Sequence, residues 1–103
     1  MTEQEVFYHS IGDSIPDAIN SQMFGKPCYK LNGKAFVSFF QDEMVFKLDG
    51  EAHKEALSLD GSHLFDPSGK GRGMKQWVQV AFDYQDQWAN FAKAAAEYIK
   101  TLK

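Results

Sequence analysis

The sequence predicts a single α+β domain over residues 1–103, with an antiparallel β-meander packed as one layer against a layer of helices. Asn32 and Gly33 separate two strand-like segments, and Asn-Gly is the preferred pair for a tight type I′ turn. A second strand pair follows, and the last twenty residues show apolar side chains at helical spacing. Because hairpins dominate, the sheet should be antiparallel and the helices should share one face.

Three helices are predicted: one at the N-terminus, a short one in the middle and a long one at the C-terminus. Thr2 and Glu5 fit a capping box, and the first helix should end near Gly12. Its buried side would carry Val6, Phe7 and Ile11. Asp49 can cap the middle helix. The long helix presents one apolar face formed by Trp88, Phe91, Ala92, Ala95, Ile99 and Leu102.

Two hairpins form the centre of the predicted sheet. The first turns at Asn32-Gly33 and the second at Asp42-Glu43. Weaker strand patterns cover residues 18–27, 63–65 and 74–80. With two-residue turns, Tyr29 pairs with Phe36 and Phe39 pairs with Phe46. The face toward the helices then carries Cys28, Ala35, Val37, Phe39, Met44, Phe46 and Leu48.

The opposite face of this sheet is the first candidate site. It carries Tyr29, Leu31, Phe36, Phe40 and Val45, joined by Trp77 from the strand at residues 74–80. A two-layer fold would leave these side chains in water, and large exposed apolar patches usually mark interaction surfaces. The pattern therefore predicts a homodimer or protein-partner interface. The alternative is that a bulge shifts the register, or that the first helix and residues 18–27 cover this face.

A glycine-rich basic loop is the second candidate site. It comprises Ser68, Gly69, Lys70, Gly71 and Arg72, followed by Lys75. Alternating glycines allow backbone N–H groups to converge, and the basic side chains add charge suited to a phosphate or carboxylate. The order required for a Walker A loop is missing. The alternative is a solvated connection between two strands.

Catalytic and metal-binding constellations are not visible in the sequence. The three histidines, His9, His53 and His63, lack the spacing of zinc ligands. Cys28 lies on the predicted core face, where a small apolar thiol is ordinary. We therefore predict no catalytic residues, no metal and no cofactor, and the sequence favours a protein that is not an enzyme without deciding the question.

Charge and cysteine content limit the classes of partner and compartment. The formal net charge is −3, whereas nucleic-acid binders usually carry a basic surplus; a local basic patch could still exist. One cysteine and an acidic N-terminus without an apolar segment favour the cytoplasm. No apolar run approaches the roughly 20 residues that a membrane span needs.

A family resemblance covers the chain from about Met23 to its end. It is carried by Met23-Phe24-Gly25-Lys26-Pro27-Cys28, Asn32-Gly33-Lys34-Ala35-Phe36, residues 40–48, Leu64-Phe65-Asp66-Pro67 and Met74-Lys75-Gln76-Trp77-Val78. These segments resemble the TfoX N-terminal domain family and its MmcQ/YjbR-like relatives, which are small bacterial proteins. The resemblance implies helices flanking an antiparallel sheet. TfoX regulates competence genes, some relatives are described as DNA-binding, and no catalytic residues are implied.

Three functions therefore stand as expectations. The first is a non-catalytic interaction or regulatory module that uses its sheet face. The second is a small anionic-ligand binder or modest enzyme that uses the loop from Gly69 to Lys75. The third is a weak nucleic-acid-associated regulator.

Overall fold

The computed structural model describes residues 2–23, 25–66 and 74–101. Six antiparallel strands form one sheet in the order β1-β2-β3-β4-β6-β5. The strands are β1 (Ile19–Met23), β2 (Lys26–Leu31), β3 (Lys34–Phe40), β4 (Glu43–Lys47), β5 (His63–Phe65) and β6 (Met74–Val80). The α-helices are α1 (Glu3–Ser14), α2 (Gly50–Ser58) and α3 (Gln85–Thr101), and α3 follows a 3₁₀ turn (Phe82–Tyr84).

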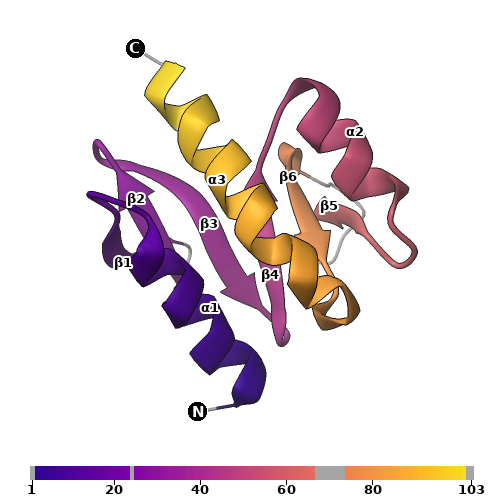
Figure 1. The fold of residues 1–103 in the computed structure, drawn as a ribbon, viewed down its shortest axis with the longest axis horizontal. Helices are drawn as coiled ribbons and strands as arrows, with labels where there is room; N and C mark the ends of the chain where they lie inside the picture. The colour runs from indigo at the N-terminus through magenta and orange to yellow at the C-terminus, as the bar shows by residue number, and fades with distance from the viewer. Residues whose placement is uncertain (1, 24, 67–73, 102–103) are drawn as a thin grey trace.

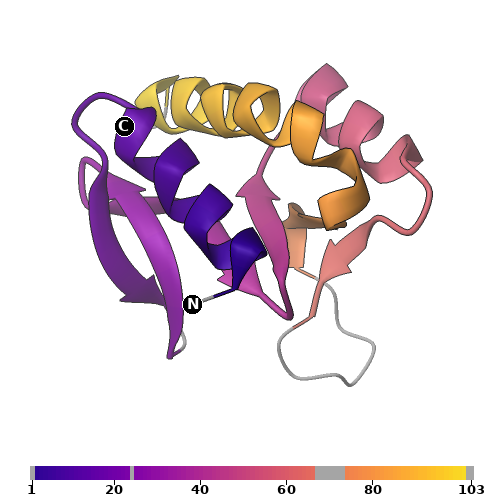
Figure 2. The ribbon, with the colours of Figure 1, turned by 60° about the horizontal axis from the view of Figure 1, so that its bottom comes forward.

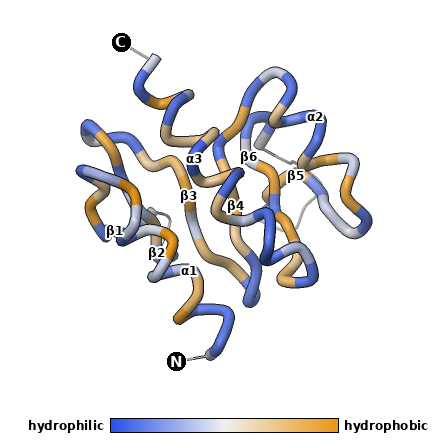
Figure 3. Tube along the Cα trace, in the orientation of Figure 1, coloured by the Kyte–Doolittle hydropathy of each residue, from blue (hydrophilic) through white to orange (hydrophobic). Residues whose placement is uncertain are grey.

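The three helices lie on one side of the sheet, in front of the strands in Figure 1, and Figure 2 shows α2 and α3 above the strands. The predicted α+β architecture is therefore confirmed. We call the helix-covered side of the sheet the inner face and the other side the outer face. Figure 3 shows apolar stretches along β3 and β4 in the middle of the molecule, whereas α2 is largely hydrophilic. Within the described ranges, no helix is long and apolar enough to cross a membrane.

Both hairpins of the meander turn on pairs of residues with positive φ. Asn32 and Gly33 have φ of 52° and 78°, as a type I′ turn requires. The second turn uses Gln41 and Asp42 instead of the predicted Asp42-Glu43, with φ of 54° and 63°. Phe39 therefore pairs with Met44 and not with Phe46. The pairing between β3 and β4 is therefore shifted by two residues. Because two is an even number, the side chains of these paired residues keep their predicted faces.

A bulge between β2 and β3 overturns the predicted register of the first hairpin. Lys30 pairs with Ala35, but Tyr29 pairs with Val37, so Phe36 is an extra residue in β3. An extra residue reverses the alternation of side chains beyond it. Tyr29, Leu31 and Phe36 consequently lie in the helix-side core with Val37. Ala35 and Cys28, both expected on the inner face, lie on the outer side instead: Ala35 packs against the buried residues there, and Cys28 pairs with Ser38, the partner of Val45.

Helix α1 docks onto β2 through a glycine. Thr2 Oγ1 accepts a hydrogen bond from the Glu5 amide at 3.1 Å, which confirms the predicted start of the helix. The helix ends at Ser14, two residues past Gly12, so Gly12 is not the cap but lies inside α1, where a Cβ atom would come within 2.2 Å of the Tyr29 ring. The buried side is Tyr8, Ile11 and Gly12, whereas Val6 is 54% exposed. The helix is thus rotated so that its smallest residue faces an aromatic ring.

Helix α3 supplies the centre of the inner core. Its buried residues are Trp88, Phe91, Ala92, Ala95, Ala96 and Ile99, so the predicted apolar face is confirmed apart from Leu102, which lies outside the described residues. Trp88 stacks on Phe7 of α1 with ring centroids 5.9 Å apart and donates its indole N–H to the Ala81 carbonyl. These contacts connect the two terminal helices to each other and connect α3 to the residue that follows β6.

The close approach of Gly12 to Tyr29 makes a stability prediction. Alanine is a better helix former than glycine by about 1 kcal/mol, but forcing a methyl group against a packed ring costs about 1–3 kcal/mol. We therefore expect Gly12→Ala to lower the urea midpoint of unfolding. Ser10→Ala, at an exposed position of the same helix, should raise the midpoint slightly. Equal stabilisation by both substitutions would contradict the proposed packing.

Candidate functional site

Three of the six predicted interface residues are buried in the inner core and cannot contact a partner. Tyr29, Leu31 and Phe36 are each at most 2% exposed and belong to the core beneath the helices. The predicted outer-face position of these residues requires an uninterrupted hairpin. The bulge at Phe36 interrupts this hairpin, so the chain itself covers these three residues.

The other predicted interface residues remain together on the outer face. Val45 and Trp77 form a small cluster with Phe65, and Phe40 and Ala35 pack against it. We call these five residues the outer cluster. Although β4 and β6 lie between their strands, the rings of Phe40 and Phe65 are 5.3 Å apart. Three strand spacings in a flat sheet would span roughly 14 Å, so the sheet curls toward its outer side.

This curl closes the middle of the outer face. Val45 and Phe65 are fully buried and Trp77 is 6% exposed, while Phe40 is half-buried. Leu64 packs toward the inner core and Phe65 joins the outer cluster, as the alternation of side chains along a strand requires. The outer cluster is therefore a second, smaller core and not an open apolar patch.

Lysine side chains surround the outer cluster. The Nζ atom of Lys26 lies 5.2 Å from the Phe40 ring centroid, and that of Lys47 lies 6.0 Å from the Trp77 centroid. Lys30 pairs with Ala35 and so shares its face. Lys75 is exposed on β6, two residues before Trp77. We call Lys26, Lys30, Lys47 and Lys75 the outer lysines.

Charge is segregated between the two layers of the protein. The six strands contain five lysines and one acidic residue, whereas the three α-helices contain seven acidic residues and three lysines. The acidic residue in the strands, Glu43, accepts a hydrogen bond from Gln79 Nε2 at 2.6 Å. The outer face therefore carries positive charge although the chain as a whole is acidic.

Most of the predicted anion-binding loop lies outside the described residues. This holds for Ser68, Gly69, Lys70, Gly71 and Arg72. Lys75 alone is described, and its backbone carbonyl lies 2.7 Å from His53 Nε2 of α2. The segment that follows the loop is thus attached to the helix layer, while the Lys75 side chain is in solvent.

A buried tyrosine network joins α1 to β2, a contact that the sequence did not reveal. Tyr29 donates a hydrogen bond to Asp13 at 2.8 Å and lies 3.2 Å from His9 Nδ1. Burial and then the Asp13 hydrogen bond raise the pKa of Tyr29 above its ordinary value. Burial also raises the pKa of Tyr8, whose hydroxyl has no hydrogen-bond partner. These phenols stay protonated at neutral pH and are poor general bases.

The remaining nucleophilic and metal-binding groups give no assembled reaction centre. Burial raises the pKa of the Cys28 thiol, which keeps it in its less nucleophilic form. Among residues 2–23, 25–66 and 74–101, no group of histidine, cysteine, aspartate and glutamate side chains could hold a metal ion.

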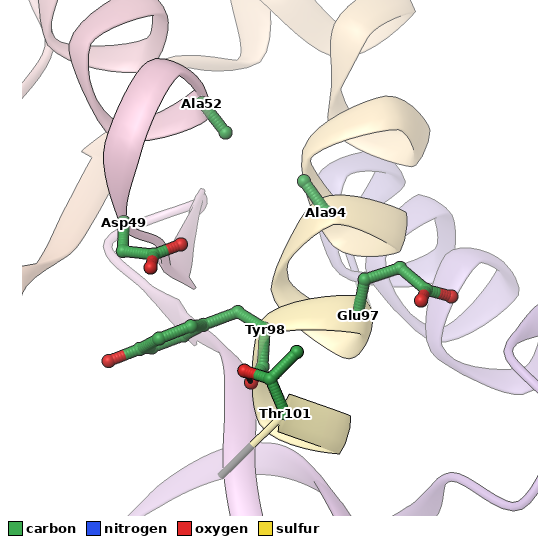
Figure 4. A pocket seen from close by; sticks show the side chains of 6 residues that line it. All are labelled: Asp49, Ala52, Ala94, Glu97, Tyr98 and Thr101. Carbon is green, nitrogen blue, oxygen red and sulfur yellow. Dashed lines mark hydrogen bonds between the residues drawn. The ribbon is translucent and has the colours of Figure 1, made fainter.

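An open pocket of about 350 Å³ lies between the start of α2 and the end of α3 (Figure 4). It is lined by Asp49, Ala52, Ala94, Glu97, Tyr98 and Thr101. Gln76 donates to the Tyr98 hydroxyl, Thr101 donates to the Tyr98 carbonyl, and Glu97 lies 3.7 Å from Lys100. Because most of its polar groups already have partners, the pocket offers no convergent set for a ligand.

Comparison with known proteins gives no relative: no family model matches the chain, and no curated protein or solved structure matches it at a significant level. The resemblance to the TfoX N-terminal domain therefore stays a prediction. The outer face, with its cluster and its lysines, is the candidate site that the geometry supports.

The raised tyrosine pKa values predict a loss of stability in alkali. A phenol whose pKa is higher in the folded state stabilises the fold below its unfolded pKa of about 10, and this stability is lost as pH rises above that value. Urea unfolding should therefore show falling stability above about pH 10. Tyr8→Phe should reduce the slope by up to about 1.4 kcal/mol per pH unit.

Stability at pH 7 provides the control for this substitution. The Tyr8 hydroxyl is buried without a partner, so its removal should leave stability at pH 7 unchanged or raise it. A Tyr8→Phe variant that keeps the wild-type slope between pH 10 and 11 would show that this tyrosine titrates normally in the folded protein.

Proposed function

We propose that this protein is a non-catalytic interaction module whose outer sheet face binds the phosphate backbone of a nucleic acid. The observation that carries the proposal is the segregation of charge, which places the outer lysines around the outer cluster while the strands contain a single acidic residue and the α-helices contain seven. A surface of this kind attracts a polyanion at one face only.

The net charge of −3 does not oppose local binding at ordinary salt. The Debye length is about 10 Å at 0.1 M salt. The molecule measures 33 × 31 × 26 Å, so acidic residues on the far side of the helix layer are largely screened from a ligand at the outer face. The local arrangement of lysines therefore matters more than the total charge.

The presence of lysines on the outer face indicates a phosphate ligand and not a protein partner. Lysine is depleted in protein–protein interfaces, whereas lysine and arginine supply most contacts to nucleic-acid phosphates. Trp77 is only 6% exposed and lies beneath Lys47, so it is not available to stack on a base. We therefore expect binding that is sequence-independent and strongly weakened by salt.

The resemblance described above agrees with this proposal. Relatives of the TfoX N-terminal domain are described as DNA-binding, and TfoX is a regulator. A cytoplasmic module that associates with nucleic acid would combine the predicted sheet-face interaction with the predicted regulatory role. The proposed contact surface is then formed by the outer lysines, with Phe40 beneath Lys26 and Trp77 beneath Lys47, while Val45 is buried.

Removal of two outer lysines tests the proposal. Lys30→Gln/Lys47→Gln should weaken binding of a fluorescent single-stranded oligonucleotide at low salt. Each lost phosphate contact should also reduce the slope of log affinity against log salt by about 0.7, hence by about 1.4 for the pair. Fluorescence anisotropy over a salt series measures both quantities.

Two lysines of the helix layer provide the matched control. Lys54→Gln/Lys93→Gln changes the net charge equally, and both residues are exposed on α2 and α3. This variant should retain most of the affinity and the salt slope. If the wild-type protein does not bind at low salt, or if both double variants lose binding equally, the proposed site is wrong.

A further inference from the structure

We infer that the free edge of β1 pairs with β1 of a second copy of this chain, antiparallel, to form one continuous sheet across a homodimer. This inference does not rest on the proposed function, because it concerns the sheet edge and not the outer lysines. It is carried by the composition of β1 and by a symmetry in the order of its residues.

The two edges of the sheet differ in how they are protected. β1 lies at one edge and pairs with β2 over five residues without a shift in register. β5 lies at the other edge, has three residues and contains a shift between Leu64 and Phe65. Short, irregular edge strands resist pairing with other chains, whereas a regular edge presents unpaired N–H and C=O groups. β1 is the edge that can accept another strand.

The composition of β1 lacks the residues that normally prevent such pairing. Natural edge strands usually carry a charged residue or a proline, and Ile19–Met23 contains neither. Ile19 is 68% exposed. Val6 of the adjoining α1 is 54% exposed, and these two are the exposed large hydrophobic residues of the described chain. The exposed apolar side chains thus belong to the two elements on the β1 side of the protein.

The residue order of β1 is self-complementary. A twofold axis through Ser21 places Ser21 opposite Ser21 of the second copy, Asn20 opposite Gln22, and Ile19 opposite Met23. Hydroxyl then faces hydroxyl, and amide faces amide. Cross-strand pairs of like chemistry stabilise an antiparallel ladder.

Neighbouring symmetric registers lose this match. An axis through Asn20 would place Ile19 opposite Ser21, and an axis through Gln22 would place Ser21 opposite Met23. An unrelated extended peptide would match the strand only by chance. The second copy is therefore the occupant that the sequence of β1 specifies.

The proposed dimer keeps both outer faces on the same side of the extended sheet. Ile19 pairs with Lys30 and Ser21 pairs with Cys28 within one copy, so these β1 residues lie on the outer face. A twofold axis perpendicular to the sheet preserves that face. The outer lysines of the two copies then form one larger basic surface.

Charge reversal at the axis tests the inference. We expect sedimentation equilibrium of the wild-type chain to show a monomer–dimer equilibrium. Ser21→Lys and Ser21→Asp each place like charges opposite one another, so each variant alone should be monomeric. An equimolar mixture of the two should restore the dimer. His63→Lys, an exposed position on β5, is the matched control and should dimerise as the wild type does.

Cysteine substitution tests the register. Both tests use a Cys28→Ser background, because Cys28 is the partner of Ser21 within one copy and its thiol could form an intramolecular disulfide. In this background Ser21→Cys should form an intermolecular disulfide under mild oxidation, because directly opposed residues bring their Cα atoms within bridging distance. Asn20→Cys should not, because it faces Gln22. Circular dichroism should show that all variants are folded.

Three results would overturn the inference. They are a wild-type chain that stays monomeric at the highest concentration reached, a dimer that Ser21→Lys leaves intact, and a disulfide that forms at position 20 in preference to 21. Because no oligonucleotide is present, none of these results bears on the outer lysines.

Discussion

The extra residue at Phe36 in β3 decides what each face of this sheet can do. Because Tyr29 pairs with Val37 while Lys30 pairs with Ala35, two consecutive side chains, Phe36 and Val37, both reach the inner core. The rings of the first hairpin are thereby available to the helices. Tyr29 packs against Gly12 and Tyr8 of α1, and the outer face keeps lysines, polar residues and a small apolar cluster.

Because of the bulge, the aromatic residues that stabilise the fold lie on the inner face, whereas the residues proposed to bind a partner lie on the outer face. Aromatic contacts on the inner face connect α1 to β2, α3 to β4, and the two helices to each other. On the outer face, the curl of the sheet brings Phe40 and Phe65 together beneath Lys26, so little apolar area is left exposed. The outer face would therefore attract a partner through its positive charge. The β1 edge would bind a strand through its unpaired backbone groups.

The sequence predicted the elements well because local signals specify them. Asn32-Gly33 turned as expected, β6 has the predicted ends, and Thr2 caps α1. The sequence did not predict the bulge, because Phe36 and Val37 suit either face of a strand and the register depends on how β3 packs against the helices. Because of the bulge, Tyr29, Leu31 and Phe36 lie in the inner core and not at an interface. Lys30, the partner of Ala35, lies on the same face as Lys47, the partner of Trp77.

Cross-strand nuclear Overhauser effects between β2 and β3 test this account most directly. The bulged register predicts contacts that join Tyr29 to Val37 and Cys28 to Ser38. An uninterrupted hairpin would instead join Tyr29 to Phe36 and Cys28 to Val37. The second pattern would move Tyr29 and Phe36 back to the outer face and contradict the division of the sheet into an aromatic inner side and a lysine-bearing outer side.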